Sequence, residues 1–442
     1  MALNACFALW LALQNKGNKQ LLWLCIAIFE IICFFLAQNR GSFVAIGIST
    51  IMMLFVWLFQ KKRSNTSRIS AGIVTFLIVC GIGILVFTIK GGETIKGFQP
   101  RLWTWESALA GVIERPLSGW GAENFPFIFD RYYNPKHYQL ESWFDRTHSV
   151  PLEYLTIGGI PLFIAYMGIF AMLYMRLIKK RKDDPLWPFF MALPVMYFVS
   201  GLVLFEVLPI YLTFFILISL TDAYTDDFKR TPLPPATKQN QIRGVIANIF
   251  FILIIAGVST ALYTTTYLPL QKNWLMLATM RTNGKTDLAI LKEHETTLRY
   301  PSPICNQEEL QGLLTFTVSY FDYLRKNHLE SQVSKEKIAS IMKFDAEEYN
   351  THAPSMIGVK TLYIRITGLL GAYQATKETA YLEEANTLIA KGSGIAPTRI
   401  EFVRLAMASA ALRNDTNAYT TALKKGKTLL PDFSWEPDMK KF

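Results

Sequence analysis

The sequence predicts an all-α protein with several membrane-spanning helices, followed by a soluble helical domain at its C-terminal end. Half of the residues are apolar (51%), aromatic residues reach 14%, and charged residues make up only 18%. This composition is typical of membrane proteins. Long apolar runs are concentrated in residues 1–267, whereas residues 268–442 carry charges on every helical turn. We therefore predict a transmembrane domain over 1–267 and a second domain over 268–442.

A helix needs about 17 to 25 apolar residues to cross a bilayer. Runs of this length are residues 20–38, 42–60, 69–89, 153–176, 186–204 and 245–267, and a shorter run is 206–221. The stretch Met1–Leu13 is apolar but short, and it lacks the basic start and small-residue cleavage site of a signal peptide. We interpret it as the remainder of a helix. We expect about seven or eight spans here, and further spans before Met1 in the natural protein or its relatives.

Short loops rich in Lys and Arg face the cytoplasm in membrane proteins. Three such loops, residues 60–68, 176–182 and 222–244, fall on one side if the predicted spans alternate in direction. The long polar loop, residues 90–150, and the C-terminal domain then face the other side. We therefore predict a multi-pass protein of the cytoplasmic (inner) membrane, with both of these regions outside the cytoplasm.

The net charge of +11 does not indicate a nucleic-acid partner. The three basic loops hold thirteen Lys and Arg residues of the kind that orient membrane proteins, and these account for the excess. Of the five cysteines, only Cys305 lies in the C-terminal domain, so no disulfide framework is expected.

Three residues far apart in the sequence are predicted to lie at the same membrane level, outside the cytoplasm. Arg40 begins a span, Arg101 begins the stretch Arg-Leu-Trp-Thr-Trp, and His148 precedes the span after the long loop. Two arginines suit a diphosphate, because guanidinium groups pair with phosphate oxygens in a bidentate manner. An imidazole with a pKa of about 6.5 can take a proton from an attacking hydroxyl. Taken singly, the arginines are more simply explained as interface anchors and the histidine as structural; together they would suit a lipid diphosphate.

The order of short motifs resembles the superfamily of O-antigen ligases and O-antigen polymerases, which also includes bacterial protein O-oligosaccharyltransferases. The resemblance extends over about residues 29–220. The motifs that carry it are Arg40-Gly41, Arg101-Leu102-Trp103, Glu114-Arg115-Pro116-Leu117-Ser118-Gly119-Trp120-Gly121, Thr147-His148 and Gly158-Gly159.

This resemblance implies a GT-C-like membrane enzyme that transfers a glycan from undecaprenyl diphosphate to an acceptor hydroxyl, with neither a metal ion nor another cofactor. It implies that Arg40 and Arg101 bind the diphosphate and that His148 activates or orients the acceptor. The acceptor stays open, because ligation to a lipid, polymerisation of repeat units and transfer to a protein share the same donor chemistry.

Four further loop residues are predicted to contact the substrate: Arg146, Trp103, Trp120 and Glu123. The tryptophans are most simply explained as part of an aromatic belt at the membrane interface, with sugar stacking as a second role. The carboxylates of the loop show no Asp-x-Asp spacing, so no metal site is predicted. His137 lacks a motif and is interpreted as a surface residue, and Glu30 inside a span is assigned no role.

The last part of the C-terminal domain looks repetitive. Residues 356–390 and 396–430 each predict two amphipathic helices, and small residues recur four apart in the second pair. This pattern resembles tetratricopeptide repeats, which stack helix pairs of about 34 residues. We predict that this tail binds an acceptor protein or an assembly partner, with a purely structural cap as the alternative.

A non-enzymatic transport or assembly protein of the envelope is the alternative from another functional class. Transporters usually place polar residues or Gly/Pro breaks near mid-membrane in several spans. Here the polar clusters lie in the loops, and the predicted spans are nearly free of charge apart from Glu30. The pattern therefore favours chemistry at the membrane surface over passage through the bilayer.

Overall fold

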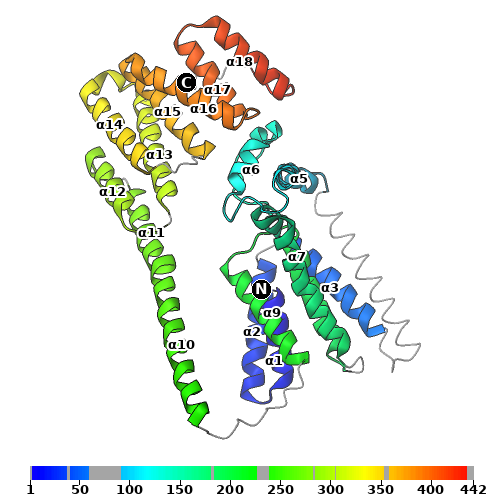
Figure 1. Cartoon of the computed structure of the whole chain (residues 1–442). Coiled ribbons are helices and arrows are strands. Elements are labelled where there is room, and N and C mark those ends of the chain that lie inside the picture. The colour runs from blue at the N-terminus through cyan, green and yellow to red at the C-terminus, as the bar shows by residue number, and fades with distance from the viewer. Residues whose placement is uncertain are drawn as a thin grey trace. The chain divides into compact units, whose positions relative to one another are not determined.

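The computed structural model describes residues 2–36, 40–58, 91–180, 184–225, 238–281, 284–303, 305–352 and 358–435 (Figure 1). Every regular element in these ranges is a helix, which confirms the predicted all-α fold. The chain forms two compact units, residues 1–230 and 231–442.

Within the described ranges, five helical segments are long and apolar enough to cross a membrane. They are α2 (Asn18–Leu36), α3 (Arg40–Leu58), α7 (Val150–Lys179), α9 (Leu208–Thr225) and the continuous stretch Val245–Thr279. These five coincide with predicted spans, and the protein is therefore a multi-pass membrane protein. Two shorter apolar helices accompany them, α1 (Ala2–Gln14) and α8 (Trp187–Gly201), the latter in place of the predicted span 186–204. The predicted span 69–89 lies outside the described residues.

In the first unit, α8 packs along α3, α1 packs along α2, and α7 packs against α8 and α9. The shared core is rich in aromatic rings. Tyr197 stacks on Phe214 with ring centroids 4.7 Å apart, and Phe170 lies 5.8 Å from Phe214. Aromatic pairs of this kind add about 0.5–1.5 kcal/mol each beyond the burial of their surface. This bundle holds α7, whose N-terminal end carries the candidate site.

The predicted long loop folds into a small helical layer at the N-terminal end of α7 (Figure 1). It comprises α5 (Gly91–Glu114), α6 (Phe125–Arg131) and the short 3-10 helix η1 (Pro135–Gln139). Its core consists of the buried side chains of Ala108, Trp120, Phe125, Ile128, Phe129, Tyr133 and Phe144. The Ser107 hydroxyl on α5 donates to the carbonyl of Tyr132 just after α6, at 2.7 Å. The insert thus satisfies much of its backbone with its own helices, as a segment outside the hydrocarbon can.

α7 is broken at Gly158-Gly159, where Gly159 has φ +66° and ψ −163°. This conformation is essentially restricted to glycine. The loop 116–121 fills the break with backbone hydrogen bonds. They run from Ile160 N–H to Pro116 O (2.8 Å), from Trp120 N–H to Thr156 O (2.7 Å) and from Gly121 N–H to Ile157 O (2.9 Å). Since Pro161 has no N–H, Ile157 O would otherwise lack a helical donor. We call this arrangement of 116–121 and 156–160 the backbone clamp.

The second unit begins with one long apolar helix. α10 (Lys238–Leu262) continues through a π-helical turn, η2 (Tyr263–Tyr267), into α11 (Leu268–Thr279), as Figure 1 shows. Because this helix is continuous, the compact unit begins before the predicted boundary at residue 267. The end of the transmembrane domain at residue 267 stays a prediction.

The rest of the second unit is helical throughout its described ranges. Its elements are α12 (Asp287–Arg299), α13 (Asn306–Lys326), η3 (Glu330–Gln332), α14 (Lys335–His352), α15 (Val359–Thr376), α16 (Thr379–Ile395), α17 (Ile400–Leu412) and α18 (Thr416–Leu429). The last four form two helix pairs, α15 with α16 and α17 with α18, where the sequence predicts them. Their assignment as tetratricopeptide repeats stays a prediction.

Candidate active site

The structure brings two of the predicted catalytic residues, Arg101 and His148, close to each other. Trp105, one helical turn after Arg101 on α5, donates its indole N–H to the carbonyl of Thr147 at 2.9 Å. This bond docks α5 against the residue that precedes His148. Arg101 lies on the same face of the helix as Trp105, because residues four apart are neighbours on a helix. Its positive charge is near enough to His148 to help lower the pKa of the imidazole.

His148 is half-buried between aromatic rings. Its imidazole makes edge-to-face contacts with Phe144 and Phe205, with ring centroids 5.3 and 5.0 Å away. Burial, then Arg101, lower the pKa of His148 from its ordinary value; Arg146 acts in the same direction and Asp145 opposes them. Within the described ranges, neither ring nitrogen of His148 takes part in a hydrogen bond. The imidazole is therefore neutral near pH 7 and able to accept a proton.

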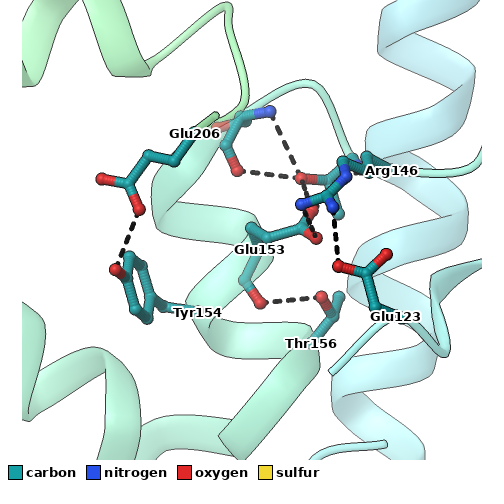
Figure 2. A network of polar contacts seen from close by, with 8 residues as sticks. Glu123, Arg146, Glu153, Tyr154, Thr156 and Glu206 are labelled. Carbon is teal, nitrogen blue, oxygen red and sulfur yellow. Dashed lines mark hydrogen bonds and ion pairs between the residues drawn. The ribbon is translucent and has the colours of Figure 1, made fainter. Parts of the chain in front are cut away.

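Glu153, in the first turn of α7, holds the turn that carries His148. Its Oε2 accepts a hydrogen bond from the Thr147 N–H at 3.1 Å and lies 2.9 Å from the Thr147 hydroxyl. Its Oε1 lies 3.8 Å from Nη1 of Arg146. Arg146 also pairs with Glu123, with Nη2 and Oε1 2.6 Å apart (Figure 2). Two predicted substrate contacts, Arg146 and Glu123, are thus bound to each other beside the His148 turn.

The two tryptophans predicted to contact substrate are occupied by packing. Trp120 is 9% exposed, its indole N–H donates to the carbonyl of Gly111 at 2.9 Å, and the Arg115 guanidinium covers its ring at 4.0 Å. It has little surface left for a substrate. Trp103 is half-buried and meets the ring of His137 edge-to-face at 5.4 Å.

The prediction that His137 is a surface residue is wrong, because its side chain is 0% exposed. Its Nδ1 lies 3.1 Å from the carbonyl of Glu141, and its ring packs against Phe129 and Phe144 at 4.9 and 5.3 Å. The small helical layer needs a core of its own, and His137 is part of it.

Arg40, the third predicted catalytic residue, is the first residue of α3. Its side chain lies outside the part of the chain whose side chains the structure describes. Among the described residues, no group of three or more His, Cys, Asp or Glu side chains is arranged to hold a metal ion.

Residues 23–167 match the O-antigen ligase family. This match supports a relationship of that part of the chain to the O-antigen ligase superfamily. No curated protein and no solved structure matches the chain.

The O-antigen ligase match extends from α2 into α7 and includes Arg40, Arg101 and His148 together with both segments of the backbone clamp. It supports a glycan-processing membrane protein of the ligase or polymerase type. It ends before Phe205 and before the second unit.

Sequence reasoning missed Glu153, Trp105 and Phe205 as parts of the site. An acidic residue in the first turn of a predicted helix is a recognisable signal for Glu153, because the helix N-terminus favours negative charge. Trp105 lies one turn from a candidate arginine. Phe205 lies in the segment between α8 and α9, and only the fold places it against His148.

Proposed function

We propose that this protein transfers a glycan from undecaprenyl diphosphate to an acceptor hydroxyl at the outer face of the cytoplasmic membrane. The observation that carries the proposal is the meeting of Arg101 and His148, which the Trp105–Thr147 hydrogen bond brings together from opposite ends of the long loop. The O-antigen ligase match over the same residues supports the reaction class.

In the proposed reaction, the acceptor oxygen forms a bond to the anomeric carbon of the donor sugar, while the bond from that carbon to the diphosphate oxygen breaks. The acceptor proton passes to a free nitrogen of His148. The electron pair of the broken bond leaves with undecaprenyl diphosphate, and Arg101 and Arg40 neutralise its charge. The step needs neither a metal ion nor a cofactor.

The chemistry of these side chains sets the size of each expected effect. General-base catalysis by a positioned histidine contributes about 10²- to 10⁴-fold in rate. A preorganised donor that stabilises developing negative charge contributes about 2.7–4 kcal/mol. Guanidinium groups suit the leaving diphosphate, since they stay charged at every relevant pH and pair with two oxygens at once.

The acceptor determines which member of the ligase and polymerase class this protein is. A lipid, a growing polysaccharide and a protein are the three candidates. In this proposal the helix pairs of the second unit are a docking surface for a protein or polymer. The positive-inside rule, applied to the three basic loops, supports a second unit that faces away from the cytoplasm.

The test is glycan transfer in envelopes that express the wild type, His148→Ala, Arg101→Ala or Arg101→Lys, with an undecaprenyl-linked donor supplied. We expect losses of about 10²-fold or more for His148→Ala and Arg101→Ala. Arg101→Lys should keep part of the rate, because lysine keeps the positive charge. It should not reach the wild-type rate, because lysine lacks the bidentate guanidinium fork. His328→Ala and Arg281→Ala, at exposed positions of the second unit, are the matched controls.

Undiminished transfer by His148→Ala and Arg101→Ala would exclude the proposed mechanism. Absence of transfer by the wild type, at normal expression, would favour the non-enzymatic transport or assembly alternative. The product of the wild type identifies the acceptor.

A further inference from the structure

The segment 202–207, between α8 and α9, forms one wall of the His148 environment. The Phe205 ring lies 5.0 Å from the imidazole of His148, at an interplanar angle of 89°. The Arg146 guanidinium lies over the same ring, 5.6 Å from its centroid. Phe205 is therefore in contact both with the candidate base, His148, and with Arg146.

Glu206, the next residue, anchors this segment to two helices of the bundle. It is 6% exposed. Its Oε2 accepts a hydrogen bond from the Tyr154 hydroxyl on α7 at 2.9 Å (Figure 2). Its Oε1 accepts one from the Tyr197 hydroxyl on α8. A third phenol, that of Tyr211 at the start of α9, also faces the carboxylate. The carboxylate is thus bound by residues of all three helices that surround it.

A carboxylate in this position is costly to bury. Among the described residues, no Lys, Arg or His forms an ion pair with Glu206. The hydroxyls of Tyr154 and Tyr197 therefore take the place of water as its hydrogen-bond partners. Burial of a charged group without a cationic partner costs several kcal/mol unless it is well hydrogen-bonded, and an apolar residue would be cheaper. The two hydrogen bonds do, however, fix the position of Glu206 and therefore also that of its neighbour Phe205.

We propose that Glu206 is a positioning residue of the transfer reaction: through Tyr154 and Tyr197 it holds Phe205 against His148, so that the imidazole keeps its orientation and water is kept from it. This inference rests on the proposed function for its catalytic meaning, but the packing it describes is measurable in any case. Phe205 is the group that contacts the base, and Glu206 acts through it.

The charged groups that face His148 are Arg101 from α5 and Asp145 and Arg146 from the loop. Arg146 loses a ring contact when Phe205 is changed, but its ion pairs with Glu123 and Glu153 do not involve Phe205 or the tyrosines. Loss of the aromatic wall then admits water to the imidazole and removes part of the burial that keeps its pKa low, so the pKa of His148 rises toward about 6.5.

The experiment is carbethoxylation of the purified full-length protein by diethyl pyrocarbonate over a range of pH. This reagent modifies neutral imidazole, and mass spectrometry of the peptide that contains His148 separates it from the other four histidines. The variants are Phe205→Leu, Tyr197→Phe, Tyr154→Phe and the double variant of residues 197 and 205. The matched control is Tyr174→Phe, which removes a hydroxyl of α7 that donates to the carbonyl of Met191, at 3.1 Å, instead of to Glu206.

We expect the pH midpoint of His148 modification to rise in Phe205→Leu, in Tyr197→Phe and in Tyr154→Phe, and to stay unchanged in Tyr174→Phe. In the double variant it should rise no further than in Phe205→Leu. Sites that act through one another are non-additive in this way. The acid-side midpoint of the pH profile of the transfer rate should shift by the same number of pH units as the modification midpoint.

A rise in Phe205→Leu without one in Tyr197→Phe or Tyr154→Phe would overturn the role of Glu206. An equal rise in Tyr174→Phe, or no rise in any variant, would overturn the proposal as well. If the wild type transfers no glycan, the proposed function fails, while the modification midpoints still decide whether Glu206 positions Phe205.

Discussion

At the scale of single residues, the backbone of His148 has φ +53°. For a residue with a Cβ, the left-handed conformation costs about 1–2 kcal/mol. The turn is held in this state from several sides: Trp105 binds the carbonyl of Thr147, Glu153 binds its N–H, and the Thr147 hydroxyl lies 2.8 Å from the carbonyl of Ser149. Strain of this kind persists where the surroundings over-determine the conformation, and it is common at functional sites.

Glu153→Ala should release this turn. The variant leaves the buried Thr147 N–H without its acceptor, at a cost of about 1–3 kcal/mol, and it frees the Arg146 guanidinium on one side. We expect a loss of transfer of about tenfold or more, with partial recovery in Glu153→Gln, whose amide oxygen can still accept. Initial rates per mole of protein in membranes measure this, and Glu106→Ala on the exposed face of α5 is the control. Equal rates for Glu153→Ala and the control would contradict the role given to this carboxylate.

The pH dependence of transfer should report the imidazole of His148. Because burial and Arg101 lower its pKa, the wild type should lose activity on the acid side with a midpoint below about 6.5. In Arg101→Gln the cation that opposes protonation is removed, so the midpoint should move to higher pH while the maximal rate falls. The rate–pH profiles of both proteins measure the shift. A lower or unchanged midpoint in Arg101→Gln would show that this charge does not act on His148.

At the scale of elements, the backbone clamp explains why two distant glycine-containing motifs occur in one chain. A Cβ on Gly119 would collide with the carbonyl of Ile157, and a Cβ on Gly159 would collide with the carbonyl of Pro116. The loop and α7 therefore approach each other closely because glycines occur on both sides. This contact sets where α7 begins relative to α5, and hence where His148 lies relative to Arg101.

Gly159→Ala should disrupt this clamp. Its φ and ψ are costly for any other residue, by about 1–3 kcal/mol, and the added methyl group meets backbone atoms that cannot rotate away. We expect a lower unfolding temperature by several degrees and a large loss of transfer. Gly168→Ala is the matched control on the same helix, because a Cβ there meets no atom within 4 Å. Thermal unfolding in detergent, followed by intrinsic fluorescence, compares the two. Equal stability would argue against the clamp.

At the scale of the whole molecule, the second unit contains buried charges that make its stability depend on pH. Burial raises the pKa of Asp345 from its ordinary value of 3.8 to about 7, although Arg365, 3.9 Å away, acts in the opposite direction. A carboxyl with a higher pKa in the folded state binds its proton more tightly when folded. Its contribution to stability is therefore complete below pH 3.8 and is lost as the pH rises through about 7.

Asp345→Asn should flatten this dependence. We expect the wild-type chain to become less stable between about pH 4 and pH 7 through this group, and the variant to show a smaller change over the same window. Thermal unfolding of both full-length proteins across this pH range measures the difference. The exposed Asp432→Asn is the control. A steeper dependence in Asp345→Asn than in the wild type would contradict the assignment.

The sequence by itself determined the all-helical class and the spans at 20–38, 42–60, 153–176, 206–221 and 245–267. It also suggested Arg101 and His148 as catalytic residues, and their roles stay a prediction. A helix that crosses lipid needs a long apolar run, and such runs are visible in the sequence without any fold. Only the tertiary structure decided that His137 is buried, that Trp120 is used in packing, that Glu153 binds the turn before His148, and that Phe205 packs against the His148 ring. These facts depend on contacts between segments that are distant in the chain, and periodicity within one segment carries no information about its neighbours.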